Sequence, residues 1–169
     1  MGPAASPDAG PAANAALFVA GLRDEHVALV AFTGLLQAEQ EALVQGDADR
    51  LGELAVDKAA KLELLTHLGE QRNRHLASQN LAASAEGMLA WIRRNQGFSA
   101  AVTKIWQALL AQAEIAQQFN NDNGALIASR QQQNRLKLSV LQTAAAPDGV
   151  YRADGQLRPL RSGRSLSQV

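Results

Sequence analysis

Residues 99–143, which read SAAVTKIWQALLAQAEIAQQFNNDNGALIASRQQQNRLKLSVLQT, decide the fold of this chain. At 100° per residue, their apolar side chains fall on one line along a helix. The members of that line are Val102, Ile105, Leu109, Ala113, Ala116, Ile127, Leu138 and Leu141. Several of them are eleven residues apart, a spacing that keeps one face of a nearly straight helix. The pattern therefore predicts a long amphipathic helix.

The same stretch contains a signal against a continuous helix. The run NNDNG at residues 120–124 costs about 3 kcal/mol of helix propensity relative to alanine, and Asn-Gly is a common turn. A turn here would give two short helices, whereas continuity would give one helix of about 65 Å at 1.5 Å per residue. The apolar line keeps its phase from Ala116 to Ile127, which a reversal of the chain has no need to preserve. We therefore favour one unbroken helix.

The middle of the apolar line is occupied by polar residues, namely Asn120, Asn123, Arg130 and Asn134. A helix that only filled a core would carry apolar side chains at these positions. The polar residues therefore contact a partner, fix the register of a core as buried polar groups, or face solvent beyond the core. Trp106 and Phe119 on the same helix are expected to lie in the core, as large aromatic side chains usually do.

Length and composition suit one helical domain with tails. The chain has 169 residues, with 16 basic residues, 16 acidic residues and no cysteine. The balanced charge gives no general attraction to nucleic acid or to an anionic membrane, and the lack of cysteine excludes disulfides and thiolate chemistry. No segment has the length and apolar character of a membrane span. The apolar residues are largely alanine and leucine, which favours an all-α fold.

Two further long helices are predicted, over residues 14–45 and about 48–77. In the first, leucine recurs every seven residues from Leu22 to Leu43, which forms a seam for packing against other helices. The connection Gly46-Asp47 supplies a helix stop followed by the N-cap of the next helix. So short a connection makes the two helices antiparallel neighbours, and we expect them to form a hairpin.

A short amphipathic helix is predicted over residues 86–95, with Gly97 as its stop. Ser99 is the expected N-cap of the long third helix that follows it. The complete prediction is an all-α fold, built from an antiparallel hairpin of long helices, a short helix and a long C-terminal helix. These elements would form a bundle of three or four helices.

The composition also predicts the domain boundaries. Residues 1–13 are expected to form a disordered leader, because proline, glycine, alanine and serine leave little apolar surface to bury. Residues 14–143 form the predicted helical domain. Residues 144–169 begin with a turn signal and contain no periodic apolar pattern, so we expect a flexible C-terminal tail.

No arrangement of residues points to catalysis or to a cofactor. The chain has no Gly-x-Ser-x-Gly motif, no phosphate-binding glycine loop and no cysteine nucleophile. Its three histidines are never three or four residues apart, so no helical pair of metal ligands exists. The arginines of the tail lack the interleaved aromatic residues of a nucleic-acid site. We predict a protein that is not an enzyme and that has no cofactor, no metal and no nucleic-acid partner.

Two other kinds of function stay open at this point. The segment His67-Leu68-Gly69 has some likeness to the exposed histidine of phosphotransfer helical bundles, but the lysine expected between leucine and glycine is missing. A half-exposed helix histidine is the simpler interpretation. Alternatively, a structural coiled-coil adaptor would associate with itself through the leucine seam from Leu22 to Leu43.

Three segments accompany the leucine hairpin, namely residues 106–110 (WQALL), residues 120–127 (NNDNGALI) and residues 150–155 (VYRADG). Together they resemble the FlgN family of bacterial flagellar export chaperones. The resemblance covers about residues 17–155 of the chain. Its most specific part is the NNDNGALI run with Tyr151, since leucine seams occur in any helical bundle.

The resemblance implies a cytoplasmic chaperone of the flagellar type III export system. Its clients would be the hook-associated proteins, kept unassembled and delivered to the export gate, with the export ATPase accessory proteins as further partners. It implies no cofactor and no stable membrane insertion, and we expect a monomer or weak homodimer. By this resemblance Tyr151 contacts the gate, and the C-terminal helix binds the client. The implied client-binding residues are Asn120, Asn123, Ile127, Arg130, Asn134, Leu136, Leu138 and Leu141.

Overall fold

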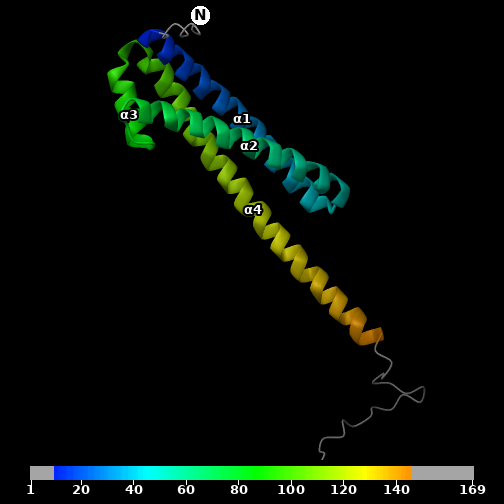
Figure 1. Cartoon of the computed structure of the whole chain (residues 1–169). Helices are drawn as coiled ribbons and strands as arrows, with labels where there is room; N and C mark the ends of the chain where they lie inside the picture. The colour runs from blue at the N-terminus through cyan, green and yellow to red at the C-terminus, as the bar shows by residue number, and fades with distance from the viewer. Residues whose placement is uncertain (1–9, 146–169) are drawn as a thin grey trace, which may run out of the picture. The chain divides into compact units, whose positions relative to one another are not determined.

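The computed structural model describes residues 10–145. Its elements are α1 (Pro11–Gln45), α2 (Ala48–Ser78), α3 (Ala85–Arg94), the short 3-10 turn η1 (Gln96–Phe98) and α4 (Ser99–Ala145), as Figure 1 shows. No strand occurs among the described residues, and the prediction of an all-α fold is confirmed. Tyr151 and most of the predicted leader and tail lie outside the described residues.

The chain is divided into two units between Ile127 and Ala128. The first contains α1, α2, α3, η1 and residues 99–127 of α4, and the second contains residues 128–145 of α4. The helix α4 is 47 residues long and passes through Gly124 without interruption. The prediction of one continuous helix over this stretch is therefore confirmed.

The α1–α2 hairpin forms as its connection predicts. Gly46 adopts the left-handed conformation (φ 79°, ψ 25°), which glycine reaches without steric cost. The backbone N–H groups of Gly46 and Asp47 both donate to the Ala42 carbonyl, at 2.9 and 3.0 Å. The Asp47 side chain then accepts from the backbone N–H of Arg50 at 3.0 Å and caps α2. The two helices lie side by side in Figure 1.

Three helix boundaries differ from the prediction. Helix α1 begins at Pro11 rather than at residue 14, because proline is favourable in the first turn of a helix. Gly97 does not end α3, which stops at Arg94, and instead lies within η1. Ser99 is not an N-cap: its backbone is helical, and its hydroxyl donates to the Gln96 carbonyl at 2.9 Å. The turn η1 leads directly into α4, so no extended residue remains to cap it.

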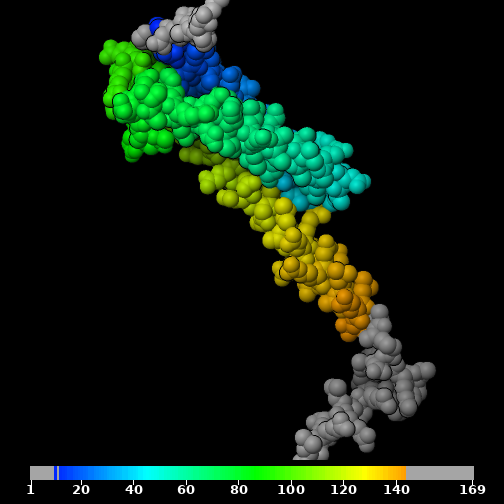
Figure 2. Space-filling view, viewed as in Figure 1, coloured from blue at the N-terminus to red at the C-terminus, as the bar shows by residue number. Residues whose placement is uncertain are grey.

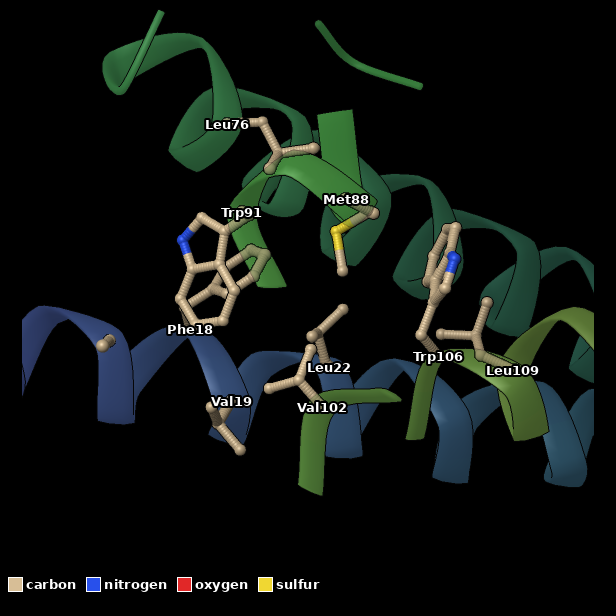
Figure 3. Packing of buried hydrophobic residues seen from close by; sticks show 10 residues of the cluster. Phe18, Val19, Leu22, Leu76, Met88, Trp91, Val102, Trp106 and Leu109 are labelled. Carbon is tan, nitrogen blue, oxygen red and sulfur yellow. The ribbon is translucent and has the colours of Figure 1, made fainter. Parts of the chain in front are cut away.

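The main core lies where all four helices of the first unit meet. Its buried members are Ala15, Phe18, Val19, Leu22, Leu76, Met88, Trp91, Val102, Trp106 and Leu109. Figure 3 shows Trp91 packed over Phe18, and the centroids of these two rings are 4.7 Å apart. Met88 points toward Leu22 (Figure 3). Trp106 lies in the core as predicted. In the space-filling view, α2 and α3 form much of the visible surface of this unit (Figure 2).

A second, smaller cluster lies further along α1 and α4. It contains Phe32, Leu36 and Ala116, with the partly buried Leu29, Leu65 and Phe119 packed against it. The leucine seam of α1 is therefore used inside the chain, since Leu22, Leu36 and Leu43 are buried and Leu29 is partly buried. The seam is not available for self-association, which argues against the coiled-coil adaptor.

Gly87 provides a test of the way in which α3 is anchored. The Ser84 hydroxyl accepts from the Gly87 backbone N–H at 3.3 Å, and a Cβ at Gly87 would overlap with the Ala82 carbonyl. We expect Gly87→Ala to lower the free energy of unfolding by about 1–3 kcal/mol, because the backbone must move to make room.

Gly52→Ala is the matched control, because a Cβ at this exposed position in α2 meets no atom within 4 Å. It should raise the free energy of unfolding by about 0.5–1 kcal/mol through helix propensity. Urea denaturation of both variants measures these changes. Equal effects of the two substitutions would contradict the close approach at Gly87.

Candidate functional site

Asn123 connects α4 to the hairpin through a polar network. Its side-chain N–H group donates to the Leu36 carbonyl and to the Glu39 carboxylate, both at 2.8 Å. The same Glu39 carboxylate accepts from the Lys58 ammonium of α2 at 2.9 Å. The network therefore joins α1, α2 and α4 within the first unit.

This location changes the interpretation of Asn123. The side chain is only 1 % exposed, so it is not accessible to a client, in contrast to the role that the family resemblance implies. Its Oδ1 atom is also buried and has no hydrogen-bond partner among the described residues. Of the alternatives for the polar residues of α4, the structure supports a buried polar group that fixes the register of α4 against α1. The buried amide of Asn123 can form its hydrogen bonds only where Leu36 and Glu39 lie opposite it.

The other two predicted site residues of the first unit face outward. Asn120 is exposed, and Ile127 is 38 % exposed. Phe119 is partly buried against the second core cluster. The NNDNG run therefore has an inner side, which carries Asn123, and an outer side, which carries Asn120.

The predicted site residues of the second unit are described by themselves. Arg130 is partly buried and Asn134 is exposed. Four large apolar side chains near the end of α4 are 57–67 % exposed, namely Leu136, Leu138, Val140 and Leu141. Exposed apolar side chains that cluster in this way mark binding surfaces more often than isolated ones do.

These four side chains lie on two faces of α4. At 100° per residue, Leu138 and Leu141 are about 60° apart, and Leu136 and Val140 are about 40° apart. Leu136 and Leu138, however, are about 160° apart. A single docked helix can therefore cover Leu138 with Leu141 but not Leu136 at the same time. We call Leu138 and Leu141 the front pair, and Leu136 and Val140 the back pair.

His75 is a partly buried polar side chain whose contacts the sequence did not reveal. Its ring stacks on Phe18 with the centroids 4.1 Å apart, and its Nε2 atom accepts from the Trp91 indole N–H at 3.2 Å. Indole can only donate, so Nε2 must be unprotonated and the ring is neutral. Burial also lowers the pKa of His75, because it disfavours the charged form.

The second titratable group with a shifted pKa is Glu25 on α1, which is buried. Its carboxylate accepts from the Arg72 guanidinium, which also lies over the Trp106 ring at 5.5 Å. Burial raises the pKa of Glu25 despite the opposing charge and hydrogen bond of Arg72. The pair therefore sits at a junction of three helices in the first unit, where its desolvation limits what it adds to stability.

The described residues contain no cluster of histidine, cysteine, aspartate or glutamate that could hold a metal ion. None of the helices between residues 10 and 145 has the length and apolar character needed to cross a membrane. His67 is exposed, and its ring contacts the Gln71 amide at 2.8 Å.

Comparison with known proteins identifies one family. The family model described as FlgN protein matches residues 16–159, which is most of the chain. No curated protein and no solved structure matches the chain. The matched range includes α1 to α4 almost completely, together with Tyr151.

Substitutions of Asn123 and Asn120 form a matched pair that tests whether the buried side of the NNDNG run stabilises the fold. We expect Asn123→Ala to lower the free energy of unfolding by about 1–3 kcal/mol, because it removes buried hydrogen bonds to the Leu36 carbonyl and to the Glu39 carboxylate. Asn120→Ala should change it by less than about 0.5 kcal/mol, because Asn120 is exposed. Chemical denaturation measures both. A stable Asn123→Ala variant would exclude the register-fixing role.

His75 predicts a dependence of stability on pH. Its lowered pKa means that, as pH falls from the ordinary value of 6.5, the unfolded chain takes up a proton that the folded chain resists. The stabilising contribution of neutral His75 is therefore present above pH 6.5 and is lost as the pH falls below this value. Glu25 acts in the opposite sense, because its pKa is raised.

The contribution of His75 to the pH dependence of stability can be isolated by comparing wild type with a His75→Gln variant. Glu25 is present in both proteins, so its own contribution cancels in the comparison. Between about pH 7.5 and about pH 5.5, wild type should lose more unfolding free energy than this variant does. His67→Gln is the control for replacing a histidine on the same helix, because the His67 side chain is exposed. Identical pH dependence of wild type and His75→Gln would refute this account.

Proposed function

This chain belongs to the FlgN family of flagellar export chaperones, and we propose that it binds hook-associated proteins through the end of α4 and delivers them to the flagellar export gate. Hook-associated proteins are the clients that chaperones of this family bind. The observation that carries the assignment to α4 is the set of four large apolar side chains exposed between residues 136 and 141.

The front pair is the proposed centre of the client surface. An amphipathic client helix can place its apolar face against Leu138 and Leu141, as helices do when they bind along a groove or another helix. Burial of the two side chains contributes up to about 3–6 kcal/mol before the entropic costs of association. That range suits a chaperone, because a client held this way can still be released.

The remaining predicted residues take different places in this proposal. Asn134 lies about 40° from Leu138, between the directions of Leu138 and Leu141 and one turn before Leu138, and would contact a polar group of the client there. Arg130 lies about 80° from Leu138, toward the side of Leu141. Leu136 belongs to the back pair and is proposed to lie outside the client contact, while Asn123 serves the core.

Delivery at the gate is the second part of the proposal. The family resemblance assigns this contact to Tyr151, which lies outside the described residues but inside the family match. The protein would act in the cytoplasm, with export ATPase accessory proteins as further partners. Neither catalysis nor a cofactor is needed, because capture and release of a client are binding steps. No observation favours phosphotransfer at His67.

The front pair can be tested against the back pair, which has similar chemistry. Leu138→Asp with Leu141→Asp should weaken binding of hook-associated proteins by about a hundredfold or more, because two charges would be placed in an apolar contact. Leu136→Asp with Val140→Asp should weaken it by less than about fivefold. The measurement is the dissociation constant by titration calorimetry.

Circular dichroism is the control for folding, and both double variants should keep their helix content because all four side chains are exposed. If the front variant binds clients as wild type does, the client surface is elsewhere. If both variants lose binding equally, the division into two faces is wrong.

A further inference from the structure

We propose that the client segment that docks on the front pair is an acidic amphipathic helix, an inference that rests on the proposed function. The described residues of the second unit carry three cations, Arg130, Arg135 and Lys137, and no aspartate or glutamate. The charges of Arg135 and Lys137, on which this inference rests, are therefore not balanced by acidic side chains in residues 128–145.

Two of these cations flank the front pair on opposite sides. Arg135 is three residues before Leu138, and Lys137 is four residues before Leu141, so each cation is the helical neighbour of one leucine. Around the helix axis the order is Arg135, Leu138, Leu141 and Lys137. A client helix that covers the two leucines would thus have a cation along each edge.

The back pair differs in this respect. Lys137 is also three residues before Val140, so the back pair has a cation on one side only, whereas the front pair has one on each side. The other residues that neighbour Leu136 and Val140 on that face are uncharged and polar, namely Gln132, Gln133, Ser139 and Thr143. Neither Arg135 nor Lys137 forms a hydrogen bond or ion pair with another described residue. The two cations are therefore available to carboxylates of a partner, and complementary charge along the edges fixes partner choice and register.

Charge and geometry favour a protein partner over the alternatives. A helix that lies on a membrane needs one broad apolar face, whereas the apolar residues here are divided between two opposite faces. Three cations give only about 3 kcal/mol of attraction to an anionic surface, too little for stable anchoring. A second copy of this segment would bring like charges together. An acidic helix with apolar residues at helical spacing satisfies both the leucines and the cations.

The test uses the full chain and the hook-associated protein that co-purifies with it. The dissociation constant is measured for wild type and for Arg135→Glu with Lys137→Glu, at about 50 mM and about 300 mM NaCl. The reversed variant should bind about tenfold more weakly at low salt, and the difference should shrink at high salt. Arg93→Glu with Lys104→Glu changes the net charge equally at exposed positions of the first unit, and it should bind within about twofold of wild type.

Each outcome separates this inference from the proposed function. If the front-pair leucine variant loses client binding while the charge-reversed variant matches wild type, the client surface stands and the acidic helix is refuted. If wild type binds no hook-associated protein, both fall. If charge reversal abolishes co-sedimentation with phosphatidylglycerol vesicles but spares the client, the cations serve a membrane and the inference is overturned. Self-association of wild type through the front pair would overturn it as well.

Discussion

The buried amide of Asn123 is the interaction on which the continuity of α4 depends. The NNDNG run disfavours a helix by about 3 kcal/mol, a cost comparable to the contribution of a few hydrogen bonds. Asn123 recovers part of this cost through its bonds to the Leu36 carbonyl and the Glu39 carboxylate, the latter an ion-assisted bond. Packing of Ala116 and Phe119 against the hairpin adds to it. Tertiary contacts thus outweigh local propensity at this run.

The sequence predicted most of the fold because its signals were periodic. The leucine seam, the Gly46-Asp47 connection and the unbroken apolar line each specify one helix or one turn, and all agree with one another. Apart from the earlier start of α1, the errors fall at Gly97 and Ser99, where a 3-10 turn leads into α4 and no extended cap residue is present. Residue propensities do not distinguish a 3-10 turn that leads into a helix from a glycine helix stop followed by a serine N-cap.

The site was less predictable than the fold. Periodicity placed Asn123 on the same line as Leu138 and Leu141, but a line along a helix does not say where the neighbouring helices end. Asn123 proved to be inside the packed unit, whereas Leu138 is exposed. His75 could not be identified at all, because its stacking on Phe18 and its bond from Trp91 arise only when three separate helices pack together. Leu136 was placed in the same client-binding set as Leu138, although two residues along a helix turn the side chain by about 200°.

The length of α4 has a consequence for the energy of binding. An isolated helix of the size of residues 128–145 is marginal in water, because its first turn must be formed at a net cost. In this chain the first turns already exist, since α4 begins at Ser99 and packs through Val102, Leu109 and Ala116. The last turns of α4 therefore need only to extend an existing helix, without the cost of forming a first turn. The front pair is therefore presented on a helix that is formed before the client arrives, and the ordering cost of binding falls chiefly on the client. A modest apolar contact of two leucines is enough under these conditions, which is the property that reversible capture requires.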